Sequence, residues 1–86
     1  MPEPQHDEAL VNNYLERVSA LSVSAFDGAD VGQELSQLMQ EARQQCKGDN
    51  LAVLAARLTD RAESAERESQ PQVRDTFAAA ASMIKP

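Results

Sequence analysis

The apolar residues of this chain recur every three or four positions, and this spacing narrows the possible folds more than any other feature. Fourteen of the 86 residues are alanine, whereas only three are aromatic. Alanine is the strongest helix former because its side chain loses no entropy in a helix. In the first third of the chain, the spacing of a one-sided helix is followed by Leu10, Val11, Tyr14, Leu15, Val18 and Leu21. The pattern predicts an all-α protein.

Three short polar segments interrupt the helical pattern and divide it into four stretches. They lie at residues 27–30, 48–50 and 69–71. Asp30 with Gln33 is predicted to cap the start of the second helix, and Gly48 its end. Asp49 or Asn50 should cap the start of the third helix, and Ser69 with Gln72 the start of the fourth. Pro71 suits the first turn of the last helix. One boundary stays open, because residues 21–26 alternate like a short strand and the first helix could end near residue 20.

Connections of only a few residues favour helices that are antiparallel neighbours. We therefore predict a small antiparallel bundle of three to four short helices, arranged as helical hairpins without a sheet. A closed four-helix bundle and two stacked hairpins both fit this prediction. Residues 7–86 would form the single helical domain, and residues 1–6 a flexible acidic leader. The centre of the core is expected at Leu35, Leu38, Leu54 and Leu58.

Histidine and cysteine each occur once in this chain, and its carboxylates are too numerous for a chance pair to indicate a catalytic site. The only histidine, His6, lies in the leader, and the only cysteine, Cys46, falls on an apolar stripe as a small buried hydrophobe would. There is no Glu-x-x-His motif, no group with the spacing of metal ligands and no glycine-rich phosphate loop. The sequence therefore predicts a protein that is not an enzyme and has no metal, cofactor or small-molecule substrate.

The net charge of −6 is unevenly distributed, since residues 1–30 hold six acids and one base. No basic stripe is present that could neutralise phosphates, which argues against direct nucleic-acid binding. The longest apolar stretch, residues 77–84, is far shorter than the ~18 residues of a membrane span. The acidic start does not resemble a secretion signal, and a single cysteine fits a reducing compartment. We expect a cytoplasmic protein without membrane contact.

The large apolar side chains are few, so the core of this chain should be thin. Below ~80 residues such a core rarely contributes more than ~3–5 kcal/mol without a disulfide, a metal or self-association. A single cysteine precludes an internal disulfide. We therefore predict a protein–protein interaction module, such as an adaptor, a chaperone-like protein or an anti-activator, that works as a homodimer or in a heteromeric complex.

The expected contact surfaces are the apolar faces of the first and fourth helices. Adjacent apolar pairs make the stripe of the first helix wider than one neighbouring helix requires. The predicted partner-binding residues are Leu10, Val11, Tyr14, Leu15, Val18, Phe77 and Ile84. Two alternatives remain open. These stripes could simply close the four-helix core, or the acidic chain could imitate a nucleic acid and block a basic site on another protein.

Overall fold

The computed structural model describes residues 7–46 and 48–84, and within these ranges the chain is helical without strands. The helices are α1 (Glu8–Phe26), α2 (Gly32–Gln45), α3 (Asp49–Arg67) and α4 (Pro71–Ile84). The prediction of a small all-α bundle is confirmed, and the three breaks lie at the predicted places. The predicted acidic leader, residues 1–6, lies outside the described residues.

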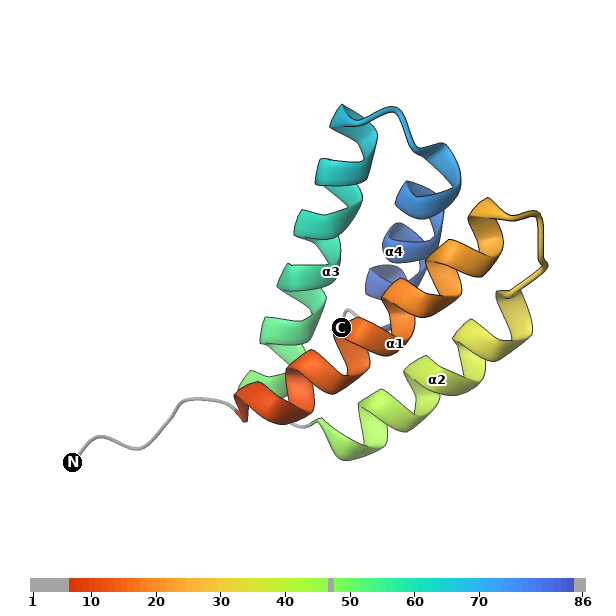
Figure 1. Cartoon of the computed structure of the whole chain (residues 1–86). Helices are drawn as coiled ribbons and strands as arrows, with labels where there is room; N and C mark the ends of the chain where they lie inside the picture. Colours follow the sequence, from red (N-terminus) through yellow and green to blue (C-terminus); the bar gives the residue numbers. More distant parts are fainter. Residues whose placement is uncertain (1–6, 47, 85–86) are drawn as a thin grey trace.

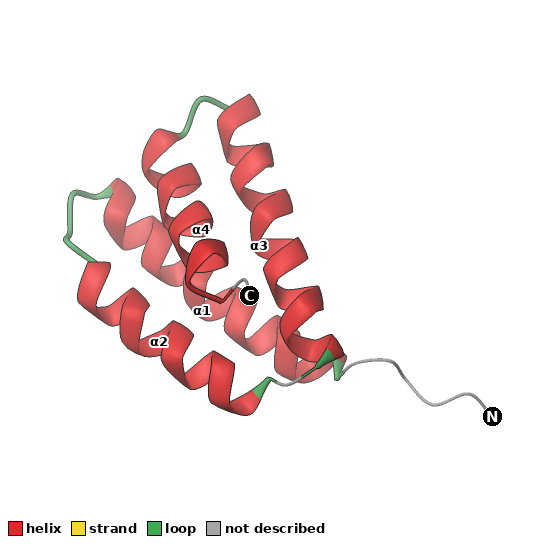
Figure 2. Ribbon diagram, turned by 180° about the vertical axis from the view of Figure 1, so that it is seen from behind, coloured by secondary structure: helices red, strands yellow, loops and turns green. Residues whose placement is uncertain are grey.

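The helices form two antiparallel hairpins, α1 with α2 and α3 with α4, that pack against each other (Figures 1 and 2). Helix α4 contacts all three other helices, whereas α2 and α3 barely touch although they follow each other in the chain. Both views show α1 and α4 lying between α2 and α3. The arrangement is therefore two stacked hairpins, and a short connection does not make α2 and α3 packed neighbours.

The core is formed by the inward faces of all four helices. The four leucines expected at its centre are buried, and Leu54 and Leu58 are fully inaccessible to solvent. The seam between α3 and α4 is rich in small side chains, with Ala62, Ala65, Ala80 and Ala81 all buried. Alanine faces allow two helix backbones to approach closely, and α3 and α4 make the most extensive helix contact in the molecule.

Helix α1 continues through residues 21–26, which settles the boundary that the sequence left open. Its N-cap is Asp7, whose Oδ1 accepts a hydrogen bond from the Leu10 amide at 3.2 Å. Negative charge at this end also complements the helix dipole. The spacing of apolar residues therefore predicted this helix, and its start agrees with the predicted beginning of the helical domain at residue 7.

Several predicted caps were wrong by one or more positions. The N-cap of α2 is Val31, and the Asp30 side chain accepts instead from the amide of Gly32 at 3.1 Å. Gly48, predicted to cap the end of α2, is the N-cap of α3 and has a positive φ of 60°. The C-cap of α2 is Cys46. Asn50 does not cap α3, because its Oδ1 accepts from the Asp7 amide at 2.6 Å. A tertiary contact replaces the local one.

Ser69 does not cap α4 but ends α3 in a left-handed conformation, with φ 59°. The Ser69 amide donates to the Glu66 carbonyl, and the Gln70 amide donates to the Ala65 carbonyl. This pair of bonds is the Schellman motif that often ends helices. Helix α1 ends with the same bonds and with Gly28, φ 100°, at the left-handed position. The ends of α1 and α3 therefore have the same hydrogen-bond pattern, with glycine at the left-handed position of one and serine at that of the other.

Candidate protein-binding groove

Six of the seven predicted partner-binding residues are buried inside the chain itself. Only Leu10 is partly exposed, and it packs against the core. The buried six are Val11, Tyr14, Leu15, Val18, Phe77 and Ile84. In the folded chain these stripes close the four-helix core, which is the first of the alternatives that the sequence left open. An exposed contact surface must therefore involve other residues.

The Tyr14 side chain is engaged within the chain. Its hydroxyl donates to Glu41 Oε2 at 2.8 Å, which links α1 to α2. The Arg17 guanidinium donates to the same oxygen at 2.8 Å and lies 5.3 Å from the centre of the Tyr14 ring. Burial and the bond to Glu41 raise the pKa of Tyr14 to about 12. The Tyr14 side chain therefore stabilises the contact between α1 and α2.

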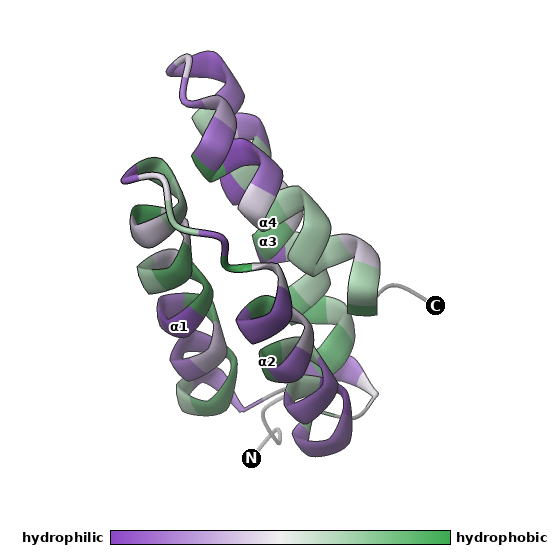
Figure 3. Ribbon diagram, turned by 90° about the vertical axis from the view of Figure 1, so that its right-hand side faces the viewer, coloured by the Kyte–Doolittle hydropathy of each residue, from purple (hydrophilic) through white to green (hydrophobic). Residues whose placement is uncertain are grey.

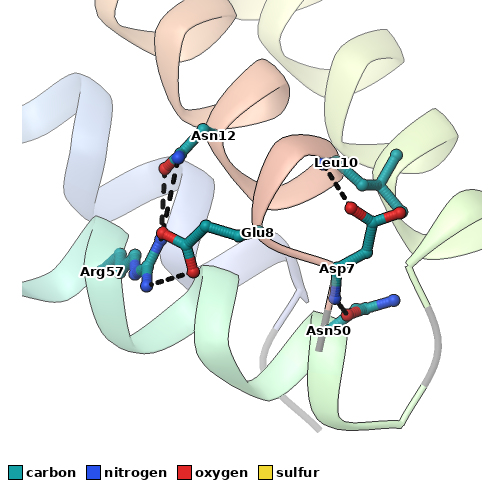
Figure 4. A network of polar contacts seen from close by, with 6 residues as sticks. All are labelled: Asp7, Glu8, Leu10, Asn12, Asn50 and Arg57. Carbon is teal, nitrogen blue, oxygen red and sulfur yellow. Dashed lines mark hydrogen bonds and ion pairs between the residues drawn. The ribbon is translucent and has the colours of Figure 1, made fainter. Parts of the chain in front are cut away.

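Polar contacts, drawn in Figure 4, join the first turns of α1 to the first half of α3. Arg57 on α3 donates to both carboxylate oxygens of Glu8, at 2.8 and 2.9 Å, and to Asn12 Oδ1 at 3.1 Å. The hydrogen bond from the Asp7 amide to Asn50 lies in the same region. A bidentate arginine–carboxylate pair has a defined geometry. This pair joins the first turn of α1 to the middle of α3.

From this junction α1 and α3 diverge, and α4 lies behind them (Figure 1). Between their C-terminal halves the structure contains an open groove of about 400 Å³, which we call the α1–α3 groove. Eleven side chains line it: Ser19, Ser22, Val23, Phe26, Arg61, Ser64, Ala65, Glu68, Gln70, Val73 and Phe77. The groove is thus bounded by α1 on one side, by α3 on the other and by the start of α4.

Two large apolar side chains of the groove are exposed to solvent. Val23 is 59% exposed and Phe26 is 56% exposed, and every other large apolar side chain within residues 7–46 and 48–84 is buried or half-buried. Beside them, Phe77 is buried and Val73 is half-buried. Figure 3 shows hydrophobic colour on the last turns of α1 and hydrophilic colour over the corner between α3 and α4. The groove therefore has one apolar wall and one polar wall.

Sequence reasoning missed Val23 and Phe26, although a signal was present. The alternation of residues 21–26 places apolar side chains on more than one face if the segment is helical. Ser22 takes the inward position and donates to the Ser19 carbonyl at 2.6 Å. Val23 and Phe26 are then left facing outward. With the small polar Ser22 on the inward face of the helix, the apolar Val23 and Phe26 lie on another face and remain exposed.

The polar wall of the groove is formed by Arg61 and Ser64 on one face of α3 and by Glu68, the C-cap residue of that helix. The hydroxyl of Ser64 lies 3.5 Å from Glu68 Oε2 as a hydrogen-bond donor. Arg61, like Arg43 and Arg67, makes no hydrogen bond or ion pair with any of the described residues, and of these three arginines only Arg61 lines the groove. The groove therefore presents one uncommitted cation and one carboxylate next to apolar surface.

Cys46 is fully buried, and burial together with the charge of Asp7 raises the pKa of its thiol. Among the described residues no three His, Cys, Asp or Glu side chains are grouped so that they could hold a metal ion. No helix in this part of the chain is long and apolar enough to cross a membrane.

Comparisons of the chain with models of known protein families, with curated proteins and with solved structures found no significant match.

Proposed function

We propose that this chain is a small protein-interaction module that binds a partner protein through the α1–α3 groove. The observation that carries the proposal is the exposure of Val23 and Phe26 beside a groove with an apolar wall. Fully burying one such side chain contributes about 1.5–3 kcal/mol. Aromatic side chains next to a pocket are common anchors of protein interfaces.

The structure of the rest of the chain supports a binding role for this region in particular. The apolar stripes of α1 and α4 are buried in the core. The large apolar side chains that stay exposed among the described residues, Val23 and Phe26, lie at one end of the bundle. An adaptor, a chaperone-like protein and an anti-activator would all use such a surface, and the partner distinguishes them. The proposal includes a cytoplasmic site of action, for which the single unpaired cysteine is the support.

A photo-crosslinking amino acid at position 23 tests the proposal in the native cell. We expect a discrete protein adduct from position 23 that is absent from a matched variant at Ala52, an exposed position on α3 outside the groove. Phe26→Ser should reduce the adduct, and circular dichroism should show that this variant keeps its helices. Equal adduct patterns at positions 23 and 52, or an adduct unaffected by Phe26→Ser, would contradict the proposal.

The purified complex then separates this function from imitation of a nucleic acid. An apolar contact keeps most of its affinity when salt is raised, whereas a mimic of phosphates loses affinity steeply. Several carboxylates of this chain are already paired with arginine, among them Glu8, Glu41 and Asp75. We therefore expect a weak dependence on salt concentration. A steep loss of affinity would favour the mimic.

A further inference from the structure

We infer that the occupant of the α1–α3 groove is an amphipathic helix of the partner that lies antiparallel to α1 and α3. It bears an acidic side chain opposite Arg61 and a basic side chain, about two turns closer to its N-terminus, opposite Glu68. This inference rests on the proposed function and specifies the chemistry of the partner.

The shape of the groove favours a helix as occupant. Two diverging helices form its walls and α4 lies between them, so a further helix would extend the existing packing (Figure 1). A volume of about 400 Å³ holds a few inserted side chains, not a whole helix. Helix-in-groove recognition works in this way, with anchors spaced by three or four residues. Val23 and Phe26 would pack against those anchors from the α1 side.

The charges of the polar wall define a pattern that the occupant must match. Glu68, the C-cap residue of α3, follows Arg61 by seven residues, which corresponds to about 10 Å along the helix axis. The chain carries a net charge of −6, yet Arg61 has no carboxylate partner among the described residues. A carboxylate from the occupant would satisfy this guanidinium beside apolar surface, where a charge-assisted hydrogen bond is strengthened.

The direction of the occupant follows from the helix ends that surround the open side of the groove. Three helix ends border this side: α1 and α3 end there, at Phe26 and Arg67, and α4 begins there at Pro71, so two C-termini stand against one N-terminus. The C-terminus of a helix carries partial negative charge, and the Glu68 carboxylate adds to it. The N-terminal end of another helix carries the complementary positive charge. An occupant antiparallel to both walls therefore places its N-terminus near Glu68 and its later turns near Arg61.

A displayed library of helical peptides tests the inference on the full chain. The library fixes leucine anchors at helical spacing and leaves two positions, seven residues apart, free to be acidic, basic or neutral. Selection on the wild-type chain, with Phe26→Ser as the counter-selection target, should enrich a basic residue at the first position and an acidic residue at the second. Binding of a selected peptide is then measured by fluorescence anisotropy.

Charge reversal at one site provides the decisive comparison. The wild-type chain should bind the selected peptide about five-fold more tightly than the same peptide with lysine at the second position. Arg61→Glu should reverse this preference. Arg43→Glu makes the same change of charge on α2, outside the groove, and should leave the preference as in the wild type.

Each other outcome overturns the inference and bears separately on the proposed function. Groove-dependent binding without a charge preference overturns the charge pattern but leaves a protein-binding groove. Failure to select any peptide that depends on Phe26 overturns the helical occupant, and crosslinking from position 23 still decides whether a protein binds there. Self-association of the chain that Phe26→Ser abolishes would identify a second copy as the occupant instead.

Discussion

The two hairpins of this protein are held together by different means. Helices α3 and α4 pack closely along a seam of buried alanines, whereas α1 and α2 make a smaller contact that includes the polar cluster of Tyr14, Arg17 and Glu41. Small side chains let backbones approach, and large or polar ones keep helices further apart. The comparison shows that an alanine-rich pattern predicts close packing as well as helix formation.

The same difference explains where the groove lies. Helix α4 is committed to α3 along its alanine face and also contacts α1 and α2. The last turns of α1 extend beside the open side of this arrangement, and Val23 and Phe26 stay exposed there. The exposed apolar surface belongs to the hairpin with the looser contact. The second hairpin forms the other side of the groove, with side chains of α3 and of the start of α4.

Truncation of a core leucine in each hairpin should produce the largest effect on stability. Leu54→Ala on α3 and Leu38→Ala on α2 should each lower the free energy of unfolding by about 2–5 kcal/mol. Leu54 is fully buried and Leu38 is 7% exposed, so the loss should be larger for Leu54. Urea denaturation followed by circular dichroism measures both. A larger loss for Leu38 would place the centre of the core in the first hairpin.

An enlarged alanine should show whether the second hairpin depends on close approach. Ala80 is fully buried on α4, and Ala80→Leu should destabilise the fold by about 1–3 kcal/mol because the added atoms have no space. Ala78→Leu, on the exposed side of the same helix, is the matched control and should change stability little. If Ala80→Leu stabilised the protein in the same denaturation assay, the seam would not be closely packed.

The two equivalent helix ends should respond with opposite signs. Gly28→Ala forces a residue with a Cβ into the left-handed conformation and should cost about 1 kcal/mol. Ser69→Gly removes the same strain from the end of α3 and should stabilise the protein by about 0.5–1 kcal/mol. Thermal unfolding of the two variants beside the wild type measures both shifts. Destabilisation by Ser69→Gly would show that the serine side chain outweighs its backbone strain.

The polar contact of the first hairpin should lose strength at high pH. The pKa of Tyr14 is raised from 10.0 to about 12, so the folded state binds its proton more tightly than the unfolded state does. This stabilisation is fully present below pH 10 and is lost as the pH rises toward 12. Tyr14 is the only tyrosine and there is no tryptophan, so tyrosinate absorbance reports its titration directly.

Tyr14→Phe is the control for that titration. The variant should lose about 1 kcal/mol at neutral pH, because the hydrogen bond to Glu41 is removed. It should also lack the decline in stability that the tyrosine causes between pH 10 and 12. A Tyr14 titration near pH 10 in the folded protein would mean that the hydroxyl is accessible to water and that its hydrogen bond to Glu41 does not stabilise the contact between α1 and α2.

Much of the fold could be predicted from the sequence because helix formation and its interruption are local properties. The spacing of apolar residues identified the helices, the breaks near Gly28, Gly48 and Pro71, and the buried leucines. These features depend on neighbours within a few positions along the chain. The same spacing could not show whether the stripes of α1 and α4 meet a partner or close the core, since both require the same pattern.

Only the tertiary structure decided which faces meet and which remain exposed. The capture of Asn50 by Asp7, the left-handed Ser69, the separation of α2 from α3 and the exposure of Phe26 all depend on how the hairpins cross. Periodicity describes a face of one helix, whereas burial depends on the area that other helices cover. Val23 and Phe26 stay exposed because no described helix covers their side of α1, and this coverage is a property of the whole fold.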